Sequence, residues 1–359
     1  MNQEQLRWME RLSNAFGPSG FEDDVIAVAR EYAEPFAEVH EDNMRNLYIT
    51  RRQNTGDRPV VMLDAHSDEV GFIVQFIKPN GTLQFLQLGG WNEFSVPGTK
   101  VYVKNDLGEY VPGIVAAKPV HFMTEEERNK PMHTADMVID IGAVSAQETR
   151  EVFHISVGAP VAPAVRFEAD EKRGIMMGKA FDCRVGCLAL LRSMKELAEA
   201  DLDVDVVGVL SSQEEVGGRG ARVAGRTVDP ALTVGFEGCP ADDTFTPEYA
   251  VQSAMKRGPM IRLMDVSMIT HPRFAKFALN VCNEKEIPMQ VAVRRGGGTN
   301  GGSIHLAPGG VPTLVLGIPV RYAHTHYGYS AAADVDAAIA LTCAILRALT
   351  PDVLRLLNP

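Results

Sequence analysis

The spacing of apolar residues predicts helices at the start of the chain. Leu6, Met9 and Leu12, followed by Ala15 and Phe16, recur at the interval that places side chains on one face of a helix. The segment GPSG then interrupts the pattern, and a second helical pattern covers residues 22–36. We therefore expect residues 2–50 to form helices followed by a strand.

The middle of the chain has a different pattern. Residues 70–163 are rich in β-branched residues, with Gly and Pro turns such as KPNGT and KNDLGEYVPG, and contain few helical periods. From GKAFDCRVGCLALLRSMKELAEA onward, helical and strand patterns alternate again, ending in the helical segment DVDAAIALTCAILRALT. We therefore predict an α/β fold in which residues 1–69 and 164–359 form one discontinuous domain, and residues 70–163 form an inserted all-β domain.

Acidic and histidine residues follow several short apolar runs that we interpret as buried strands. The runs lie in PVVMLDAHSDEVG, VDVVGVLSSQEEVGGRGA, ALTVGFEGCPADD and VPTLVLGIPVRYAHTH. In an open α/β sheet, chemistry gathers where strands end at their carboxyl edges, so residues far apart in sequence meet in one crevice. The residues expected there, with Asp182 at the start of a helical segment, are His66, Asp68, Glu214, Glu215, Glu237 and His324.

Composition narrows the class of protein. The chain has 359 residues, of which 45% are hydrophobic and 23% charged, as in an ordinary globular enzyme. Its formal net charge of -11 argues against nucleic-acid binding, which needs clustered positive charge. We expect no membrane partner, because no apolar run is long enough to span a bilayer and the first residues lack a signal peptide's apolar centre. The five cysteines form no disulfide-framework pattern, so we expect reduced thiols and a cytoplasmic location.

The residues expected at the strand ends have the chemistry of a two-metal hydrolytic site. Their imidazole nitrogens and carboxylate oxygens, without a thiolate, suit zinc, cobalt or manganese. Three carboxylates and a bridging hydroxide balance two divalent cations, and the histidines are then neutral ligands. Asp182 is the natural bridge, because one short carboxylate can join two metals about 3.5–4 Å apart. The predicted ligands are His66, Asp182, Glu215, Glu237 and His324.

Two further acidic residues have candidate roles beside these ligands. Glu214 is not needed as a ligand, and it is placed to take a proton from the nucleophile and return it to the leaving group. Asp68 follows His66 by two residues, so it can accept the other ring N–H of that histidine and fix its tautomer.

Each candidate also has a purely structural explanation. His66 fits a strand-end histidine that satisfies local hydrogen bonds. Glu214 and Glu215 fit a solvated first turn of a helix, and Asp182 fits a helix N-cap. The metal interpretation depends on the joint pattern, because all five predicted ligands are expected at a strand end or at a strand-to-helix turn.

Motifs along nearly the whole chain resemble one family of enzymes. The motifs are GPSGFE, DNMRNL, HSDEVGF, GKAFDCRVG, QEEVGGRGA, EGCPADD, RGGGTNGGSIH and PVRYAHT. Together they resemble the dinuclear-metal aminopeptidases that form tetrahedral (TET-type) dodecamers, a group that includes glutamyl and deblocking aminopeptidases and endoglucanase-labelled relatives. By position, the resemblance implies the same five metal ligands, with Glu214 as general base and Asp68 as the residue that orients His66.

The resemblance also implies an architecture and an activity. The fold would be a mixed-sheet, zinc-peptidase-like catalytic domain carrying a PDZ-like β-barrel used in dimerisation. The reaction would be removal of N-terminal amino acids from short peptides, with two Zn²⁺ or Co²⁺ ions per subunit, inside a hollow homo-oligomer. Two alternatives stay open: a related binuclear amidohydrolase or deacylase, and a non-catalytic assembly subunit.

Three positions depart from the family pattern. Cys183 stands where an aspartate commonly follows the bridging aspartate, so it either removes a negative charge near the metals or packs as a small apolar residue. Asn300 stands where an aspartate is common, and His326 and Gly328 replace a more usual Ser and Glu-containing segment. These departures leave the predicted ligands intact and bear on the substrate pocket.

Two other features lie beside the predicted site. The glycine cluster at residues 296–302 lacks the Lys-Ser/Thr of a P-loop, and it is better interpreted as a backbone loop that passes close to a substrate. Arg184, Arg219 and Arg321 each lie next to a ligand segment. They either hold a ligand or substrate carboxylate or brace the fold.

Overall fold

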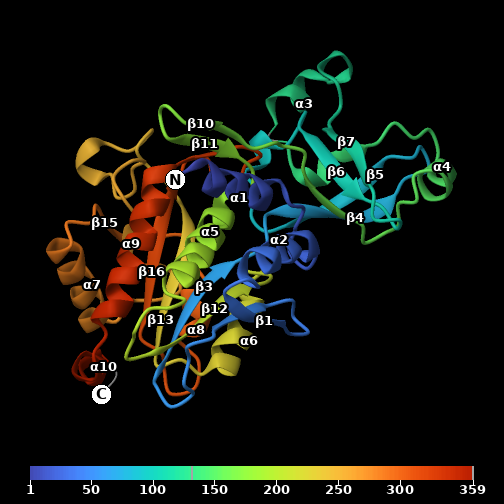
Figure 1. Ribbon diagram of the computed structural model, residues 1–359. Helices are drawn as coiled ribbons and strands as arrows, with labels where there is room; N and C mark the ends of the chain where they lie inside the picture. The colour runs from blue at the N-terminus through green and yellow to red at the C-terminus, as the bar shows by residue number, and fades with distance from the viewer. Residues whose placement is uncertain (131, 358–359) are drawn as a thin grey trace.

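The structure is a computed structural model that describes residues 1–130 and 132–357, and it has a mixed α/β fold (Figure 1). Its helices are α1 (Gln3–Asn14), α2 (Asp23–Ala33), α3 (Glu125–Asn129), α4 (Ala146–Glu151), α5 (Phe181–Glu196), α6 (Arg219–Val228), α7 (Pro272–Glu284), α8 (Gly301–Ile304), α9 (Ala332–Ala348) and α10 (Pro351–Leu357). Its strands are β1 (Ala37–Glu41), β2 (Leu47–Arg51), β3 (Val60–His66), β4 (Gly71–Ile77), β5 (Leu83–Leu88), β6 (Lys100–Lys104), β7 (Tyr110–Ala116), β8 (Val138–Asp140), β9 (Pro160–Pro163), β10 (Glu168–Asp170), β11 (Ile175–Gly178), β12 (Asp205–Ser211), β13 (Leu232–Pro240), β14 (Met260–Met264), β15 (Gln290–Val293), β16 (Thr313–Val320) and β17 (Gly328–Ala331). Short 3-10 helices are η1 (Glu93–Ser95), η2 (Val120–Phe122), η3 (Thr134–Asp136) and η4 (Glu248–Ala250).

The larger part of the molecule is built on an eight-stranded sheet with the order β1-β2-β12-β3-β13-β16-β14-β15. The four central strands, β12, β3, β13 and β16, are parallel, whereas β2 and β14 run antiparallel to their neighbours on either side. The mixed sheet that we predicted is therefore present. Because the central strands are parallel, their carboxyl ends meet at one edge, where a site of several loops is expected.

Helices cover both faces of this sheet. Alternate residues of a strand point to opposite faces, and β3 follows this rule. Val61 and Leu63 pack in a large core with α1, α2, α5, α7 and α9, whereas Met62 packs in a smaller core with α6 and α8. Helices α5 and α9 lie along the sheet in Figure 1. A separate three-stranded sheet has the order β10-β11-β17.

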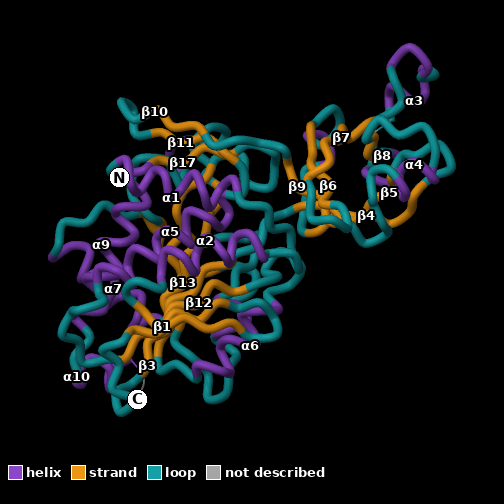
Figure 2. Tube along the Cα trace, turned by 45° about the vertical axis from the view of Figure 1, so that its right-hand side comes forward, coloured by secondary structure: helices purple, strands orange, loops and turns teal. Residues whose placement is uncertain are grey.

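The smaller part is a closed barrel of β4-β5-β8-β7-β6-β9 beside the large sheet (Figure 2). It has a hydrophobic core of its own, which includes Phe72, Phe85, Val103 and Val161. Its strands lie within the β-rich stretch predicted as an insert. The exact domain boundaries and the likeness to a PDZ domain stay predictions.

The N-terminal segment is partly as predicted. Both expected helices are present as α1 and α2, but the single strand expected before residue 50 is two antiparallel strands, β1 and β2. Asp42 makes the turn between them by accepting hydrogen bonds from the backbone N–H groups of Met44 and Asn46. Such side-chain to backbone bonds favour a turn over a continuous strand.

Within residues 1–130 and 132–357, no single helix has both the length and the apolar composition needed to cross a membrane. One pair of helices, α9 and α10, meets those two criteria jointly, with a bend of 105° between them.

Candidate metal centre

The carboxyl edge of the large sheet brings the predicted residues together. His66 is the last residue of β3, Glu214 and Glu215 lie in the loop between β12 and α6, and His324 lies in the loop between β16 and β17. Asp182 lies in the first turn of α5. The parallel order of the central strands explains why residues so far apart in sequence share one edge.

Glu237 reaches the site in a way that we did not predict. It lies inside β13 and is not at a strand end, so that expectation was wrong. Pairing between β3 and β13 stops at Asp64 and Gly235, and continuing this register places Glu237 beside the end of β3. Glu237 Oε1 lies 3.5 Å from His66 Nε2. The early end of β3 therefore lets an interior residue of β13 act as an edge residue.

Asp182 lies between the two histidines. Its Oδ1 is 3.0 Å from His66 Nε2, and its Oδ2 is 3.4 Å from His324 Nε2. Its backbone can approach β13 because Gly238 has no side chain; a Cβ there would lie 2.6 Å from the Asp182 Cα. Each carboxylate oxygen of Asp182 thus faces a different imidazole nitrogen, which is the arrangement that a bridging ligand needs.

Two groups of potential ligand atoms are close enough to hold a metal ion. One contains His66, Asp182 and Cys183, and the other contains Asp182, Glu215 and His324. In the second group, His324 Nε2 is 3.3 Å from Glu215 Oε2. The Oε1 atom of Glu215 is buried without a hydrogen-bond partner in the described chain. A buried acceptor of this kind fits a cation, and the set of nitrogen and oxygen donors suits zinc or cobalt.

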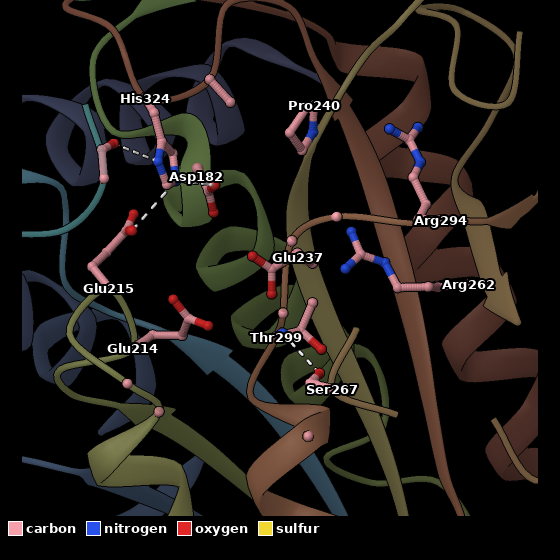
Figure 3. Close-up of a pocket in the computed structure, with 18 of the residues that line it drawn as sticks. Asp182, Glu214, Glu215, Glu237, Pro240, Arg262, Ser267, Arg294, Thr299 and His324 are labelled. Atoms are coloured by element: carbon pink, nitrogen blue, oxygen red, sulfur yellow. Dashed lines mark hydrogen bonds and ion pairs between the residues drawn. The ribbon is translucent and has the colours of Figure 1, made fainter. Parts of the chain in front are cut away.

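His324 is oriented by the barrel part of the chain. Its Nδ1 is 2.7 Å from the carbonyl oxygen of Gly90, in the segment that follows β5. A carbonyl only accepts, so Nδ1 carries the proton and donates it. The Nε2 lone pair is then free for a metal, as is usual for metal-binding histidines whose second nitrogen is hydrogen-bonded. Figure 3 shows this contact as a dashed line at His324.

Asp68 organises the opposite side of the site. Its buried carboxylate accepts hydrogen bonds from the backbone N–H groups of Glu214 (2.9 Å) and Glu215 (3.1 Å) and from the Ser19 hydroxyl (2.6 Å). Its Oδ1 also lies 3.3 Å from His66 Nδ1. One carboxylate therefore holds the loop of the predicted base and ligand and lies against the ring of another ligand.

Glu214 lines a cavity of about 860 Å³, together with Asp182, Glu215 and Glu237 (Figure 3). Burial and the neighbouring carboxylates raise the pKa of Glu214 well above its usual value. A raised pKa makes a carboxylate a stronger proton acceptor than an ordinary glutamate. Among the described residues, the Glu214 carboxylate makes no hydrogen bond or ion pair with either histidine, so it is available to a substrate or a water molecule in the cavity.

The ligand candidates are strongly perturbed by burial and by one another. Burial raises the pKa of Glu215 to about 8 and that of Glu237 to about 7. Burial opposes the charged ring of His324, but Asp182 and Glu215 raise its pKa to about 10. These shifts describe desolvated charges held close together, an arrangement that bound cations relieve.

The structural explanations for single residues fail on geometry. Asp182 is not an N-cap, because α5 is preceded by Ala180 and no side chain caps it. Glu214 and Glu215 do not form a first helical turn, since α6 begins at Arg219. His66 does not cap a loop, because its Nε2 points at two acidic side chains.

The three departures from the family pattern have separate outcomes. Cys183 is buried with Sγ 3.4 Å from the Phe236 carbonyl, and burial raises the pKa of its thiol well above the usual value. Asn300 does not line the cavity; its amide donates to Asp64 and Ser211 behind the cavity wall. The effect of this Asp-to-Asn difference on the charge of the substrate pocket stays a prediction.

His326 and Gly328 do not line the large cavity, although Gly328 lines a small pocket beside it with Asp182, Glu215 and His324. The ring of His326 is buried and packs against Trp91, with a centroid distance of 5.2 Å. Burial lowers the pKa of His326 to about 4. Gly328 is the first residue of β17 and pairs with Gly178. These positions connect the barrel and the small sheet to the site, and neither is among the residues that line the cavity.

Two of the three arginines singled out from the sequence, Arg184 and Arg321, brace the fold. Arg184 is buried and donates to the Leu12 carbonyl (2.6 Å), and Arg321 forms an ion pair with Asp243 (2.6 Å). Arg219 donates to the side chain of Gln213. Gly296, Gly297, Gly298 and Gly302 of the glycine loop all line the cavity, and the approach of this loop to a substrate stays a prediction.

Several contacts around the site were not predicted from the sequence. Ser19 and Glu22 lie in the GPSGFE motif but were not assigned a role. Glu22 accepts a hydrogen bond from the Gln213 backbone N–H (3.2 Å), and burial beside Asp68 raises its pKa to about 7. Gly90 acts through its backbone carbonyl, which no side-chain pattern reveals. The wall formed by Arg262 and Arg294 was also missed, although Arg294 lies only two residues before the glycine loop.

Gly89→Ala is expected to weaken metal binding. A Cβ at this position would lie 2.7 Å from Val70 Cγ1 and 3.0 Å from Glu215 Cβ, at a φ of +79°. Gly98→Ala is a matched control, because its φ is +80° and nothing lies within 4 Å of its Cβ. Both variants carry the ~1–2 kcal/mol cost of a left-handed alanine. Calorimetric titration with Zn²⁺ should therefore show a weaker affinity for Gly89→Ala alone, and equal affinities would contradict the role of this contact.

The fold and the site together define a peptide hydrolase of the aminopeptidase class. A model of the M42 glutamyl aminopeptidase family matches residues 46–341, and the chain belongs to this family. Both the predicted resemblance and the prediction of an enzyme are confirmed. Members of this family are metal-dependent, in agreement with the two groups of potential ligands.

Individual relatives extend the match to nearly the whole chain. The chain is 32% identical to the glutamyl aminopeptidase of Lactococcus lactis subsp. cremoris over 286 residues, 79% of each protein. It is 30% identical to the lysyl aminopeptidase of Pyrococcus furiosus over 355 residues, 96% of this chain and 97% of that protein. A crystal structure of a TET aminopeptidase from a marine sediment thaumarchaeon has a TM-score of 0.93 at 37% identity, covering 98% of this chain and 99% of that one.

Proposed function

We propose that this protein removes N-terminal amino acids from short peptides at a dinuclear metal site. The observation that carries the proposal is the position of Asp182, whose two carboxylate oxygens face His66 and His324 separately. A ligand for a single ion has no need of two opposed histidines, whereas a bridging ligand does. His66 and Glu237 would hold one ion with Asp182, and Glu215 and His324 would hold the other.

The residues present fit two divalent cations. The donors are imidazole nitrogens and carboxylate oxygens, and a buried Glu215 oxygen lacks a partner among the described residues. Zn²⁺ or Co²⁺ ions, when bound, would polarise the scissile carbonyl and activate a water molecule at neutral pH. The number and identity of the ions are part of the proposal.

The remaining residues supply proton transfer and orientation. Glu214 takes the proton of the attacking water at its carboxylate and delivers it to the nitrogen of the leaving amine. Asp68 is a positioning residue for Glu214 and His66. The carboxylates around the cavity attract the free α-amine of a peptide, so the substrate is oriented with its N-terminus at the metal centre.

N-acetylated substrates are expected to react poorly. Acetylation removes the positive charge of the α-amine, so the attraction to the acidic cavity is lost. The test is a panel of aminoacyl p-nitroanilides, each with its acetylated counterpart, assayed with added Co²⁺ or Zn²⁺. Preferential turnover of the acetylated compounds would replace this proposal with the deacylase alternative. No turnover of either series by protein that binds both ions would favour a non-catalytic assembly subunit.

Assembly and location complete the proposal. We propose a homo-oligomer located in the cytoplasm. The five cysteines, all free and buried, support a reducing location. Large apolar side chains exposed on the barrel support self-association: Phe76, Leu86, Phe94, Ile114 and Phe122. The dodecameric size and the dimerising role of the barrel are tested by light scattering of the purified protein. One relative is a glutamyl aminopeptidase and the other a lysyl aminopeptidase, so the relatives do not indicate which N-terminal residue this protein removes.

A further inference from the structure

A second set of polar side chains lines the same cavity, away from the predicted base. Arg262 on β14, Arg294 after β15, and Thr299 in the glycine loop all line the wall of the cavity. Figure 3 shows the guanidinium group of Arg262 directed toward Glu237, with Arg294 beside it, while Glu214 and Glu215 lie on the other side. The cavity therefore has an acidic end and a basic end.

The basic end contains several buried polar atoms without partners. Among the described residues, Arg262 Nε, Arg294 Nε, Arg294 Nη2 and Thr299 Oγ1 are buried and have no hydrogen bond. A guanidinium group can only donate, and it stays charged in proteins. Buried donors are normally satisfied, so this concentration of unpaired donors in one wall calls for an anionic acceptor from outside the chain.

The arginines are held in place without being fully paired. Arg262 donates to Asp265 (2.9 Å) and to Cys239 Sγ (2.8 Å), which fixes its plane and leaves Nε free. Arg294 Nη2 lies 3.4 Å from Asp242, and the same atom makes no hydrogen bond. Guanidinium groups fixed in this way are preorganised for a planar carboxylate.

The distance between the basic end and the predicted metal centre is about the length of one amino-acid side chain. Glu237 pairs with Gly317 of β16, and Gly317 pairs with Met260 of β14, so Arg262 starts two strands and two residues from Glu237. Two strand spacings are about 10 Å, most of which the arginine side chain spans. A glutamate carboxylate lies roughly 4 Å from its own Cα. The first residue of a peptide held at the metal centre can therefore reach these arginines with its side chain.

We propose that Arg262, Arg294 and Thr299 form the subsite for the side chain of the substrate's N-terminal residue, and that this side chain is acidic. The inference rests on the proposed function, because it assumes a peptide whose first residue is held at the metal centre. Glutamate and aspartate satisfy the unpaired donors, whereas lysine meets two like charges, and leucine leaves the donors unpaired.

The test compares kcat/KM for the p-nitroanilides of glutamate, aspartate, leucine and lysine, using the full-length protein loaded with Zn²⁺ or Co²⁺. We expect the glutamyl compound to exceed the leucyl one by about 10- to 100-fold, the ratio set by hydrogen bonds to a charged group. Arg294→Met should lower this ratio about tenfold, mainly through KM, since a bound carboxylate loses one partner. Arg294→Glu should reverse the order of the glutamyl and lysyl compounds. Arg222→Met, on the exposed face of α6, is the matched control and should keep the wild-type ratio.

The outcomes separate this inference from the proposed function. Cleavage of the leucyl or lysyl compound in preference to both acidic ones overturns the subsite while the aminopeptidase proposal stands. No cleavage of any compound overturns the aminopeptidase proposal itself. A preference for Leu-Ala over Leu-Ala-amide that disappears in Arg294→Met would assign the arginines to a substrate C-terminus and overturn the subsite. Product inhibition of the wild-type protein needs no variant: free glutamate should inhibit at lower concentration than leucine, and the reverse order contradicts the proposal.

Discussion

Glu214→Gln should lower kcat by about 10²- to 10⁴-fold, the range expected when a general base is removed. The amide keeps the size of the side chain but cannot accept a proton from water. Glu214 contacts neither histidine, so the content of bound metal should not change. The measurements are steady-state kinetics and elemental analysis of the same preparation.

Two comparisons make the Glu214 result specific. Glu248→Gln changes an exposed glutamate in η4, outside the cavity, and should keep wild-type kcat and metal content. Glu215→Gln should lose activity together with one of the two ions. A Glu214→Gln protein that also loses metal would mean that Glu214 is a ligand, and the proposed division between base and ligand would be wrong.

Asp182→Asn should abolish activity and the binding of both ions. Its two oxygens face different histidines, so one substitution removes the single negative charge that both halves of the site share. The loss should exceed the ~10- to 100-fold effect typical of a residue that only supports a ligand. The measurement is the number of Zn²⁺ ions retained per chain after gel filtration.

A graded series tests whether Asp182 is a bridge. Glu237→Gln and Glu215→Gln should each retain about one ion, because each removes a ligand from only one half of a two-metal site. Circular dichroism of the metal-free proteins checks that all variants fold. Retention of one ion by Asp182→Asn, equal to that of the single-ligand variants, would show that Asp182 serves one ion only.

The pattern of apolar runs predicted much of the fold and the membership of the site. Strand-end residues such as His66 are readable because a buried parallel strand is a continuous apolar run followed by its polar loop. The β-rich texture of the insert was readable for a similar reason. Glu237 was predicted correctly as a member of the site but for an incorrect reason. Its access to the site depends on where the neighbouring strand ends. The register between strands that are distant in sequence cannot be predicted from a local pattern of residues.

Two kinds of contact could not be predicted: those made by backbone groups, and those made by cavity-lining residues that are distant in sequence from the predicted ligands. The carbonyl of Gly90 and the N–H groups that bind Asp68 belong to every residue type, so their use depends only on three-dimensional position. The wall formed by Arg262 and Arg294 depends on the order of β16, β14 and β15 in the sheet. Arg184 shows the converse, because a charge next to a ligand segment turned out to brace the N-terminal helix.

The hydrogen bond between His324 and Gly90 limits how the two parts of the chain can diverge. The carbonyl group that sets the tautomer of this ring belongs to the segment that follows β5. A barrel grafted from another protein must therefore place this carbonyl oxygen within hydrogen-bonding distance of His324 Nδ1. Chimeras are therefore best cut so that residues 89–91 come from the same parent as the loop that carries His324. A chimera that separates these two segments would fold in both parts, but the imidazole ring of His324 would lose its fixed orientation.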